Sequence, residues 1–199
     1  MSEGHYFDAT PAVPSRPSQV ELVLPDFRAI LGADRGVFSA GGVDPGTVQL
    51  LRAVPSPVVS GHILDLGCGY GPIACTLAHR SPASTVWAVD VNDRALALTA
   101  ANAEALAQPN VRAVRPEHVP ADLTFDGIWS NPPIRIGKTA LHELLQSWLP
   151  RLKLGAPAWL VVQRHLGADS LASWLGAEGW KVTRTGSKRG YRILKVEHP

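Results

Sequence analysis

Two short stretches of the sequence contain residue types whose spacing could support chemistry on a bound nucleotide. The first is ILDLGCGYG at residues 63–71, where an apolar strand pattern ends in an acid, Asp65, and in three glycines at alternate positions, Gly67, Gly69 and Gly71. Glycine lets the backbone approach a ligand closely and adopts φ angles that other residues avoid. Because a helical pattern with Pro72 in its first turn follows, this stretch predicts a strand, a glycine turn and a helix N-terminus that hold a nucleotide.

The spacing of the glycines and the acid before them favours one kind of nucleotide. A dinucleotide fingerprint reads G-x-G-x-x-G, whereas this chain has G-x-G-x-G preceded by Asp65. A carboxylate at that place would repel a pyrophosphate but suits a ligand that carries an ammonium group. S-adenosylmethionine has an amine and a positive sulfonium, so we expect it as the cofactor. A nicotinamide cofactor is a distant alternative, and the glycines alone would also fit a β–α turn without a ligand.

Acidic residues after the second and third strand patterns complete the expected cofactor site. Asp90 ends the strand pattern at 85–90, where an acid can accept hydrogen bonds from both ribose hydroxyls. Glu117 and His118 follow the strand pattern at 111–114, in a loop that would lie beside the adenine. Glu117 could accept from the adenine amine or be an ordinary surface acid. We interpret His118 as a loop histidine of the cofactor site rather than a catalytic residue.

The second stretch is SNPP at residues 130–133, at the end of a strand pattern. Pro132 and Pro133 fix the backbone and remove donors, so the carbonyl groups around them should be acceptors without local partners. Asn131 adds a side-chain acceptor. Two acceptors can hold an amine by both N–H bonds and direct its lone pair at an electrophile, so that positioning and electrostatics supply most of the catalysis. The alternative interpretation is a stiffened strand exit without chemistry.

Strands and helices alternate along the rest of the chain and must position these stretches. Strands are expected at 61–66, 85–90, 111–114, 125–130, 158–163, 180–184 and 191–196, and helices at 72–79, 93–106 (capped by Asp93), 141–152 and 169–176. The alternation predicts an α/β fold with a doubly wound, mostly parallel seven-stranded sheet. The last two strands are joined by a short turn and should pair antiparallel near the edge. Ligands of such sheets bind at the carboxyl ends of the strands, where Asp65, Asp90 and Asn131 fall.

The N-terminal part of the chain has a different pattern. Residues 1–18 hold three prolines without periodicity and predict an irregular arm. An antiparallel hairpin is expected from 19–24 and 27–31, and a helix at 47–54. We therefore expect one domain over 19–199, in which 19–58 form the hairpin and helix and 59–199 a Rossmann-like core.

Charge and cysteine content narrow the partners and the compartment. Residues 1–130 hold 8 Lys/Arg and 13 Asp/Glu, whereas residues 131–199 hold 11 Lys/Arg and 4 Asp/Glu. The basic C-terminal part could meet a polyanion such as RNA or be a solvated surface, and charge alone does not decide. Cys68 and Cys75 have no metal-type cluster around them and fit small buried thiols. With no membrane-length apolar run and no signal-peptide core, we expect a soluble, cytoplasmic protein without metal or membrane partner.

Several motifs of the chain resemble those of one family. DLGCGYGP at 65–72, VDVN at 89–92 and SNPP at 130–133 resemble the class I S-adenosylmethionine-dependent methyltransferases. Further motifs are similar, more narrowly, to the small-domain group that includes the RsmC-like ribosomal RNA guanine-N2 methyltransferases. They are GVFS at 36–39, DPGT at 44–47, Gln163 and GYR at 190–192. The resemblance covers about residues 34–196.

This resemblance implies a fold, a cofactor and roles for individual residues. It implies S-adenosylmethionine as donor, and Asn131, Pro132 and Pro133 at the target amine. The residues implied at the cofactor or at the mouth of its site are Phe38, Thr47, Asp65, Gly67, Gly69, Gly71, Asp90, Val91, Asn92, Glu117, His118 and Asn131. The same Asn-Pro-Pro motif also occurs in enzymes that act on adenine or on protein glutamine.

The chain departs from the family pattern at three places. Ile134 stands where base methyltransferases often have an aromatic residue that stacks on a flipped base. Pro116-Glu117 replaces a frequent Ser-Asp, and only a short arm stands where full-length RsmC-like enzymes carry an N-terminal domain.

The predicted function is N-methylation of a guanine exocyclic amine in ribosomal RNA. Basic residues around the second motif could bind the RNA backbone without reading its sequence, or they could be solvated. They are Arg135, Lys138, Lys188, Arg189 and Arg192. Ile134 would contact the target nucleobase. One alternative is a methyltransferase that acts on protein glutamine or a small-molecule amine. Another, suggested by Ile134, is a non-catalytic RNA-binding module that keeps the cofactor pocket.

Overall fold

The computed structural model describes residues 13–39 and 41–199. Most of the predicted N-terminal arm lies outside the described residues, and its remainder, residues 13–17, has no helix or strand. The division into an arm and one domain stays a prediction. No helix of the described part is long and apolar enough to span a membrane.

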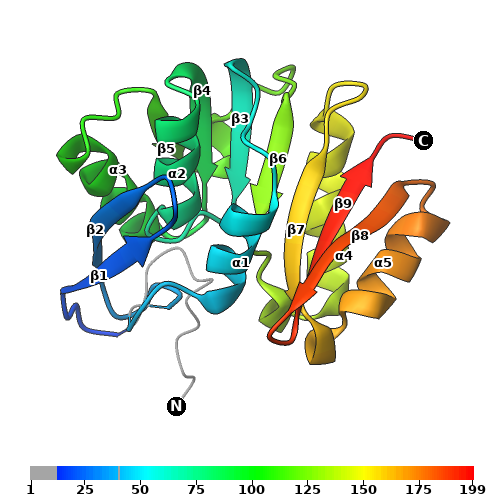
Figure 1. The fold of residues 1–199 in the computed structure, drawn as a ribbon, viewed down its shortest axis with the longest axis horizontal. Helices are drawn as coiled ribbons and strands as arrows, with labels where there is room; N and C mark the ends of the chain where they lie inside the picture. The colour runs from blue at the N-terminus through cyan, green and yellow to red at the C-terminus, as the bar shows by residue number, and fades with distance from the viewer. Residues whose placement is uncertain (1–12, 40) are drawn as a thin grey trace.

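A seven-stranded sheet with the order β5-β4-β3-β6-β7-β9-β8 forms the centre of the molecule (Figure 1). Its strands are β3 (Ser60–Leu66), β4 (Ala83–Val89), β5 (Val111–Val114), β6 (Gly127–Ser130), β7 (Ala158–Gln163), β8 (Lys181–Lys188) and β9 (Tyr191–Glu197). Strand β9 is antiparallel to both of its neighbours, and the other pairs are parallel. The predicted doubly wound sheet with one reversed strand near its edge is confirmed.

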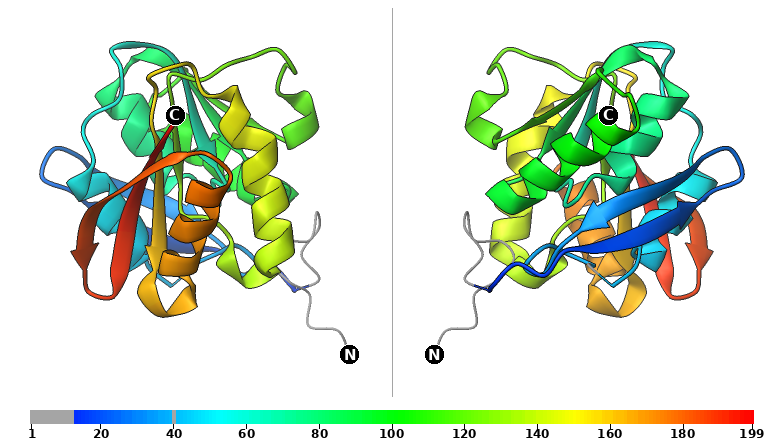
Figure 2. Two further views of the ribbon diagram at one scale, coloured as in Figure 1. Left: turned by 90° about the vertical axis from the view of Figure 1, so that its right-hand side faces the viewer. Right: turned by 90° about the vertical axis from the view of Figure 1, so that its left-hand side faces the viewer.

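Helices cover both faces of this sheet (Figure 2). Helices α1 (Pro45–Ala53), α2 (Pro72–Arg80) and α3 (Asp93–Ala105) contribute to the core on one face. Helices α4 (Lys138–Trp148) and α5 (Ala168–Ala177) contribute to the core on the other. Short 3₁₀ helices at Pro116–His118, Ile134–Ile136, Leu149–Arg151 and Arg164–Leu166 complete the connections. Burial on both faces explains why the central strands are nearly continuous apolar runs.

The N-terminal hairpin is a separate two-stranded antiparallel sheet of β1 (Ser18–Val23) and β2 (Arg28–Ala33). Asn102 of α3 joins it to the core, because its amide accepts from the backbone N–H of Gly32 at 2.7 Å and donates to the Gly32 carbonyl at 2.9 Å. The same amide donates to the carbonyl of Tyr70 at 2.8 Å. The hairpin is therefore fixed against the glycine turn.

Besides shifts of a few residues at element ends, three details differ from the expectation. Asn92, not Asp93, caps α3, because its side chain accepts from the backbone N–H groups of Arg94 and Ala95, whereas Asp93 pairs with Arg115. The helix expected at 141–152 is α4 from Lys138 to Trp148 followed by a 3₁₀ turn. Strand β8 continues past an irregularity after Arg184 and ends at Lys188, so that a two-residue turn joins it to β9.

Asp65 lies near the end of β3 and is completely buried. Its Oδ2 accepts the backbone N–H of Ala74 in the first turns of α2 at 2.9 Å, whereas Oδ1 has no hydrogen-bond partner within the described residues. Burial raises the pKa of Asp65 from 3.8 to about 8, and the nearby Asp90 adds to the rise. The carboxyl group is therefore mostly neutral at pH 7.

We expect Asp65→Asn to change how stability depends on pH. Between pH 4 and 8 the Asp65 carboxyl group holds a proton in the folded protein and has lost it in the unfolded chain. The free energy of unfolding therefore falls by up to about 1.4 kcal/mol for each unit by which the pH rises. Asparagine keeps an acceptor for Ala74 but does not titrate. Urea unfolding from pH 5 to 8 should therefore show a shallower decline for the variant.

Asp26→Asn is the matched control for this measurement. Its hydrogen bond with Arg80 lowers the pKa of Asp26, so that this carboxylate is ionised in both states throughout the same range. The difference between Asp26→Asn and the unaltered protein should be constant from pH 5 to 8. Parallel curves for Asp65→Asn and the unaltered protein would contradict the neutral carboxyl group.

Candidate active site

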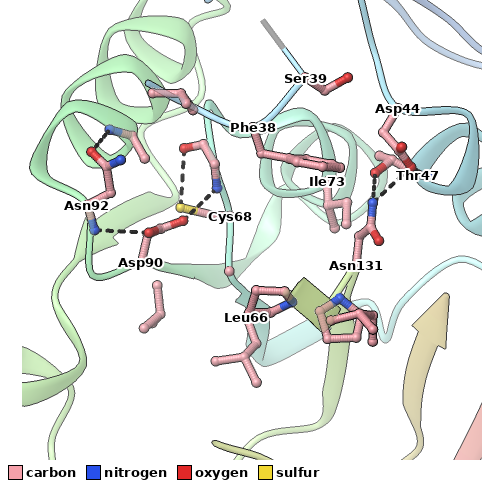
Figure 3. Close-up of a pocket in the computed structure, with 18 of the residues that line it drawn as sticks. Phe38, Ser39, Asp44, Thr47, Leu66, Cys68, Ile73, Asp90, Asn92 and Asn131 are labelled. Atoms are coloured by element: carbon pink, nitrogen blue, oxygen red, sulfur yellow. Dashed lines mark hydrogen bonds between the residues drawn. The ribbon is translucent and has the colours of Figure 1, made fainter. Parts of the chain in front are cut away.

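A cavity of about 310 Å³ opens at the carboxyl ends of the central strands (Figure 3). It brings together the two stretches that the sequence singles out, because β3 lies between β4 and β6 in the sheet. Of the predicted site residues, those on its wall are Phe38, Thr47, Gly67, Gly69, Asp90, Val91, Asn92, Asn131, Pro132, Pro133, Ile134 and Arg135.

The glycine turn is held against the end of β4 and leaves space in front of it. The backbone N–H groups of Gly67 and Cys68 donate to the carbonyl of Val89 at 2.8 and 3.0 Å. Gly67 has a φ angle of +76° and Gly69 of +57°, in the left-handed region. A Cβ atom on Gly67 would lie 3.9 Å from Cδ of Pro133. The missing side chain therefore keeps open the space between the glycine turn and the Asn-Pro-Pro motif.

Asp90 fixes the cofactor side of the cavity. Its Oδ2 accepts the backbone N–H of Gly69 at 2.9 Å, and its Oδ1 accepts that of Asn92 at 3.0 Å. Burial raises the pKa of Asp90, although these backbone hydrogen bonds oppose the rise. Asn92 donates in turn to the carbonyl of Gly36 at 3.0 Å, which holds the segment that carries Phe38. An acceptor at this position, with apolar Leu66 and Ile73 beside the cavity, fits a ribose and its attached groups.

Several predicted cofactor residues do not line the cavity. Asp65 is buried behind the glycine turn, as described above. Gly71 has a φ angle of +88° and caps α2, where a Cβ atom would approach Oγ1 of Thr99 to 2.9 Å, so its role is in helix packing. Glu117 points toward Arg115 at 3.8 Å and is mostly exposed. Pro116 of the same loop is on the wall, whereas Glu117 and His118 are not, and the role of these two residues at the adenine stays a prediction.

Asn131 is held in one orientation by α1. Its Nδ2 donates to Oδ1 of Asp44 at 2.9 Å and to Oγ1 of Thr47 at 3.1 Å. Figure 3 shows the amide nitrogen turned toward these residues and the oxygen turned away from them. Asp44 itself is fixed because it caps α1 and accepts the backbone N–H of Thr47 at 3.0 Å. The side-chain oxygen of Asn131 is thus left as an acceptor.

The backbone after Asn131 corrects one expectation. The Pro132 carbonyl accepts the backbone N–H of Ile134 at 2.8 Å, and the Pro133 carbonyl accepts that of Ile136 at 3.1 Å. These carbonyl groups therefore do have local partners, because the chain turns into a 3₁₀ helix at Ile134. Each keeps a second lone pair.

Three polar residues of the site received no role from the sequence, although the family resemblance includes them. Asp44, Gln163 and Tyr191 all line the cavity. Tyr191 donates its hydroxyl to Oδ2 of Asp44 at 3.4 Å and accepts from Nε2 of Gln163 at 2.8 Å. The only local signal was the Asp44-Pro45 pair, which is typical of a helix cap. The hydrogen bonds that join them to one another, and Asp44 to Asn131, connect residues far apart in the chain.

The predicted basic residues lie at the same edge but at different distances from the cavity. Arg135 is on its wall, whereas Lys138 lines a smaller neighbouring hollow. Arg189 is in the turn between β8 and β9, and the carbonyl of Gly190 in that turn accepts the backbone N–H of Arg164 at 2.7 Å, next to the end of β7. Arg192 pairs with Asp169 instead.

Comparisons with known proteins agree with this geometry. Residues 28–195 match the family of the methyltransferase small domain. The uncharacterized protein YbxB of Bacillus subtilis (strain 168) is 36% identical in an alignment that covers 99% of this chain and 99% of its own. Ribosomal RNA small subunit methyltransferase C of Shewanella sp. (strain MR-4) is 32% identical over 80% of this chain and 47% of its own.

A solved structure gives the same fold. It is that of the T. thermophilus 16S rRNA N2 G1207 methyltransferase (RsmC) in complex with AdoMet and guanosine. The two chains are 25% identical and superpose with a TM-score of 0.75, and the match covers 95% of this chain and 52% of the other. The chain thus spans about half the length of the ribosomal RNA methyltransferases that it matches. From the family match and the cavity between the glycine turn and the Asn-Pro-Pro motif, we conclude that the chain belongs to the methyltransferase small domain family of S-adenosylmethionine-dependent methyltransferases.

Proposed function

We propose that this protein methylates the exocyclic N2 amine of a guanine in ribosomal RNA. The observation that carries the proposal is the fixed amide of Asn131, whose oxygen is left as an acceptor across the cavity from the glycine turn. The similarity to ribosomal RNA methyltransferases over most of this chain supports the substrate class.

The residues on one side of the cavity suit the methyl donor. S-adenosylmethionine, when bound, supplies an electrophilic methyl group on a positively charged sulfur. Asp90 would accept from its ribose hydroxyls, and Gly67 would allow the closest approach of the backbone. The carboxylate of Asp90 on the cavity wall favours a cationic ligand over a pyrophosphate.

Asn131 and Pro132 position the amine for attack. The amide oxygen of Asn131 and the second lone pair of the Pro132 carbonyl accept its two N–H bonds. A nitrogen held in this way directs its lone pair across the space that Gly67 leaves open. A nitrogen–carbon bond forms as the carbon–sulfur bond breaks, and the nitrogen then releases one proton to water. Fixed acceptors stabilise the positive charge that develops on the nitrogen.

The basic residues at this edge support RNA as the substrate. Arg135 on the cavity wall, with Lys138 and Arg189 at the same edge, would bind phosphates without reading the sequence. Ile134 would cover one face of the target base, with less stacking than an aromatic residue. Other rings line the same cavity, among them Phe38 and Tyr191.

We expect methyl transfer to RNA when the protein is given labelled S-adenosylmethionine and undermodified ribosomal subunits or naked ribosomal RNA. Digestion to nucleosides and mass spectrometry should find the label as N2-methylguanosine. Label in ribosomal protein or in small molecules would contradict the proposal in favour of those substrates. Binding of both cofactor and RNA without any product would favour a non-catalytic module.

We expect Asn131→Ala to lower kcat by at least about 100-fold, as loss of a fixed polar group at the reacting centre does in other enzymes. Calorimetry should find little change in cofactor affinity, because the glycine turn and Asp90 are unchanged. Leu154→Ala, at a side chain that is 87% exposed, is the control for activity and melting temperature. Full activity of Asn131→Ala would exclude the role given to this amide.

We expect the opposite pattern for Asp90→Ala. Loss of a hydrogen-bonding carboxylate should weaken cofactor binding in calorimetry by at least about tenfold, since hydrogen bonds to charged groups contribute about 1.5–3 kcal/mol. Asp90→Asn should be milder, because its amide oxygen still accepts one backbone N–H. Unchanged affinity in both variants would remove Asp90 from the cofactor site.

A further inference from the structure

One chain of hydrogen bonds joins the end of β7 to the end of β6. Gln163, the last residue of β7, donates from Nε2 to the hydroxyl of Tyr191 at 2.8 Å. Tyr191, the first residue of β9, donates that hydroxyl to Oδ2 of Asp44 at 3.4 Å. The other carboxylate oxygen of Asp44 accepts from Nδ2 of Asn131 at 2.9 Å. All four residues line the cavity.

The Asp44 carboxylate sets the direction of every hydrogen bond in this chain. An ionised carboxylate accepts and cannot donate. Asn131 must therefore turn its NH₂ group toward Asp44, and Tyr191 must donate its O–H. The tyrosine oxygen then accepts from the NH₂ group of Gln163. As a result, both amide oxygens, those of Asn131 and Gln163, are left as acceptors. Neither oxygen has a hydrogen bond within the described residues.

The fold places these two acceptors at one edge. Strands β6 and β7 are parallel neighbours, and Ser130 pairs with Leu160, so Asn131 and Gln163 both follow that pair toward the carboxyl end. Tyr191 reaches Asp44 because residue 46 is glycine. A Cβ atom on Gly46 would lie 2.5 Å from the tyrosine ring.

We propose that Asn131 and Gln163 form a pair of acceptors that selects a base edge with two adjacent hydrogen-bond donors, and that Asp44 is the positioning residue that fixes their direction. The inference rests on the proposed function, and it assigns the choice of base to Gln163. Guanine carries a ring N1–H beside its 2-amino group and matches this pair. Adenine and 2-aminopurine carry an amine beside a ring nitrogen that only accepts, which would leave Gln163 unpaired against a lone pair.

Binding of two nucleosides tests this selection directly. Guanosine and 2-aminopurine riboside both carry the 2-amino group, and 2-aminopurine lacks the N1–H and the 6-oxygen. In the presence of S-adenosylhomocysteine, we expect calorimetry or ligand-observed NMR to show a preference for guanosine of at least about tenfold. Gln163→Leu should reduce the preference to within about threefold, mainly by weakening guanosine binding.

Asp44→Asn tests the role of the carboxylate without removing the helix cap. Asparagine caps helices about as well as aspartate, so α1 should remain and the melting temperature should change little. An amide at residue 44 can donate as well as accept, which allows the amides of Asn131 and Gln163 to reverse. We expect kcat for methyl transfer to fall at least about tenfold, and the preference for guanosine to shrink. The cofactor affinity should stay the same.

The outcomes separate this inference from the proposed function. Equal binding of the two nucleosides, no binding of either, or a preference that survives in Gln163→Leu would overturn the inference, even if RNA is methylated. A guanosine preference that depends on Gln163 without transfer to any RNA would support the inference and contradict the proposed function. Unchanged kcat and preference in Asp44→Asn would remove Asp44 from the positioning role.

Discussion

The site depends on how the end of β4 holds the turn that follows β3. The carbonyl of Val89 accepts from the backbone N–H groups of Gly67 and Cys68, and one residue later Asp90 accepts from Gly69. The first residues of the turn are therefore tied to the neighbouring strand rather than to their own helix. Because β6 lies on the other side of β3, the same turn faces Asn131. The sheet order thus places the glycine turn and the Asn-Pro-Pro motif on the same cavity.

Much of this arrangement could be predicted because it follows from local patterns. The apolar strands, the glycine spacing, and the acid and asparagine at strand ends are all short-range features. Parallel sheets place such strand ends at a common edge. Strand boundaries at β5 and β7 agree with the expectation, and the two unpaired thiols, Cys68 and Cys75, are buried as expected.

Other positions in the site have physical reasons that a local pattern does not contain. Asp65 is in the glycine motif, but its side chain turns into the protein toward Ala74, because β3 is buried on both faces. Glu117 turns outward because Arg115 lies two residues before it and attracts it. Asp44, Gln163 and Tyr191 come together only because β9 inserts between β7 and β8, which brings the start of the last strand against α1.

The distribution of charge around the cavity bears on how it would hold a positively charged ligand. Asp90 and Asp65 have raised pKa values because burial removes them from water and no basic side chain forms an ion pair with either within the described residues. A positive ligand in the cavity would lower the pKa of Asp90 on the wall, and it would lower that of the buried Asp65 behind the glycine turn less. Methyl transfer converts the sulfonium into a neutral thioether, so the product loses this attraction while the carboxyl groups remain. The Asp90 carboxylate on the cavity wall would therefore attract the positively charged form of the cofactor more strongly than the neutral product.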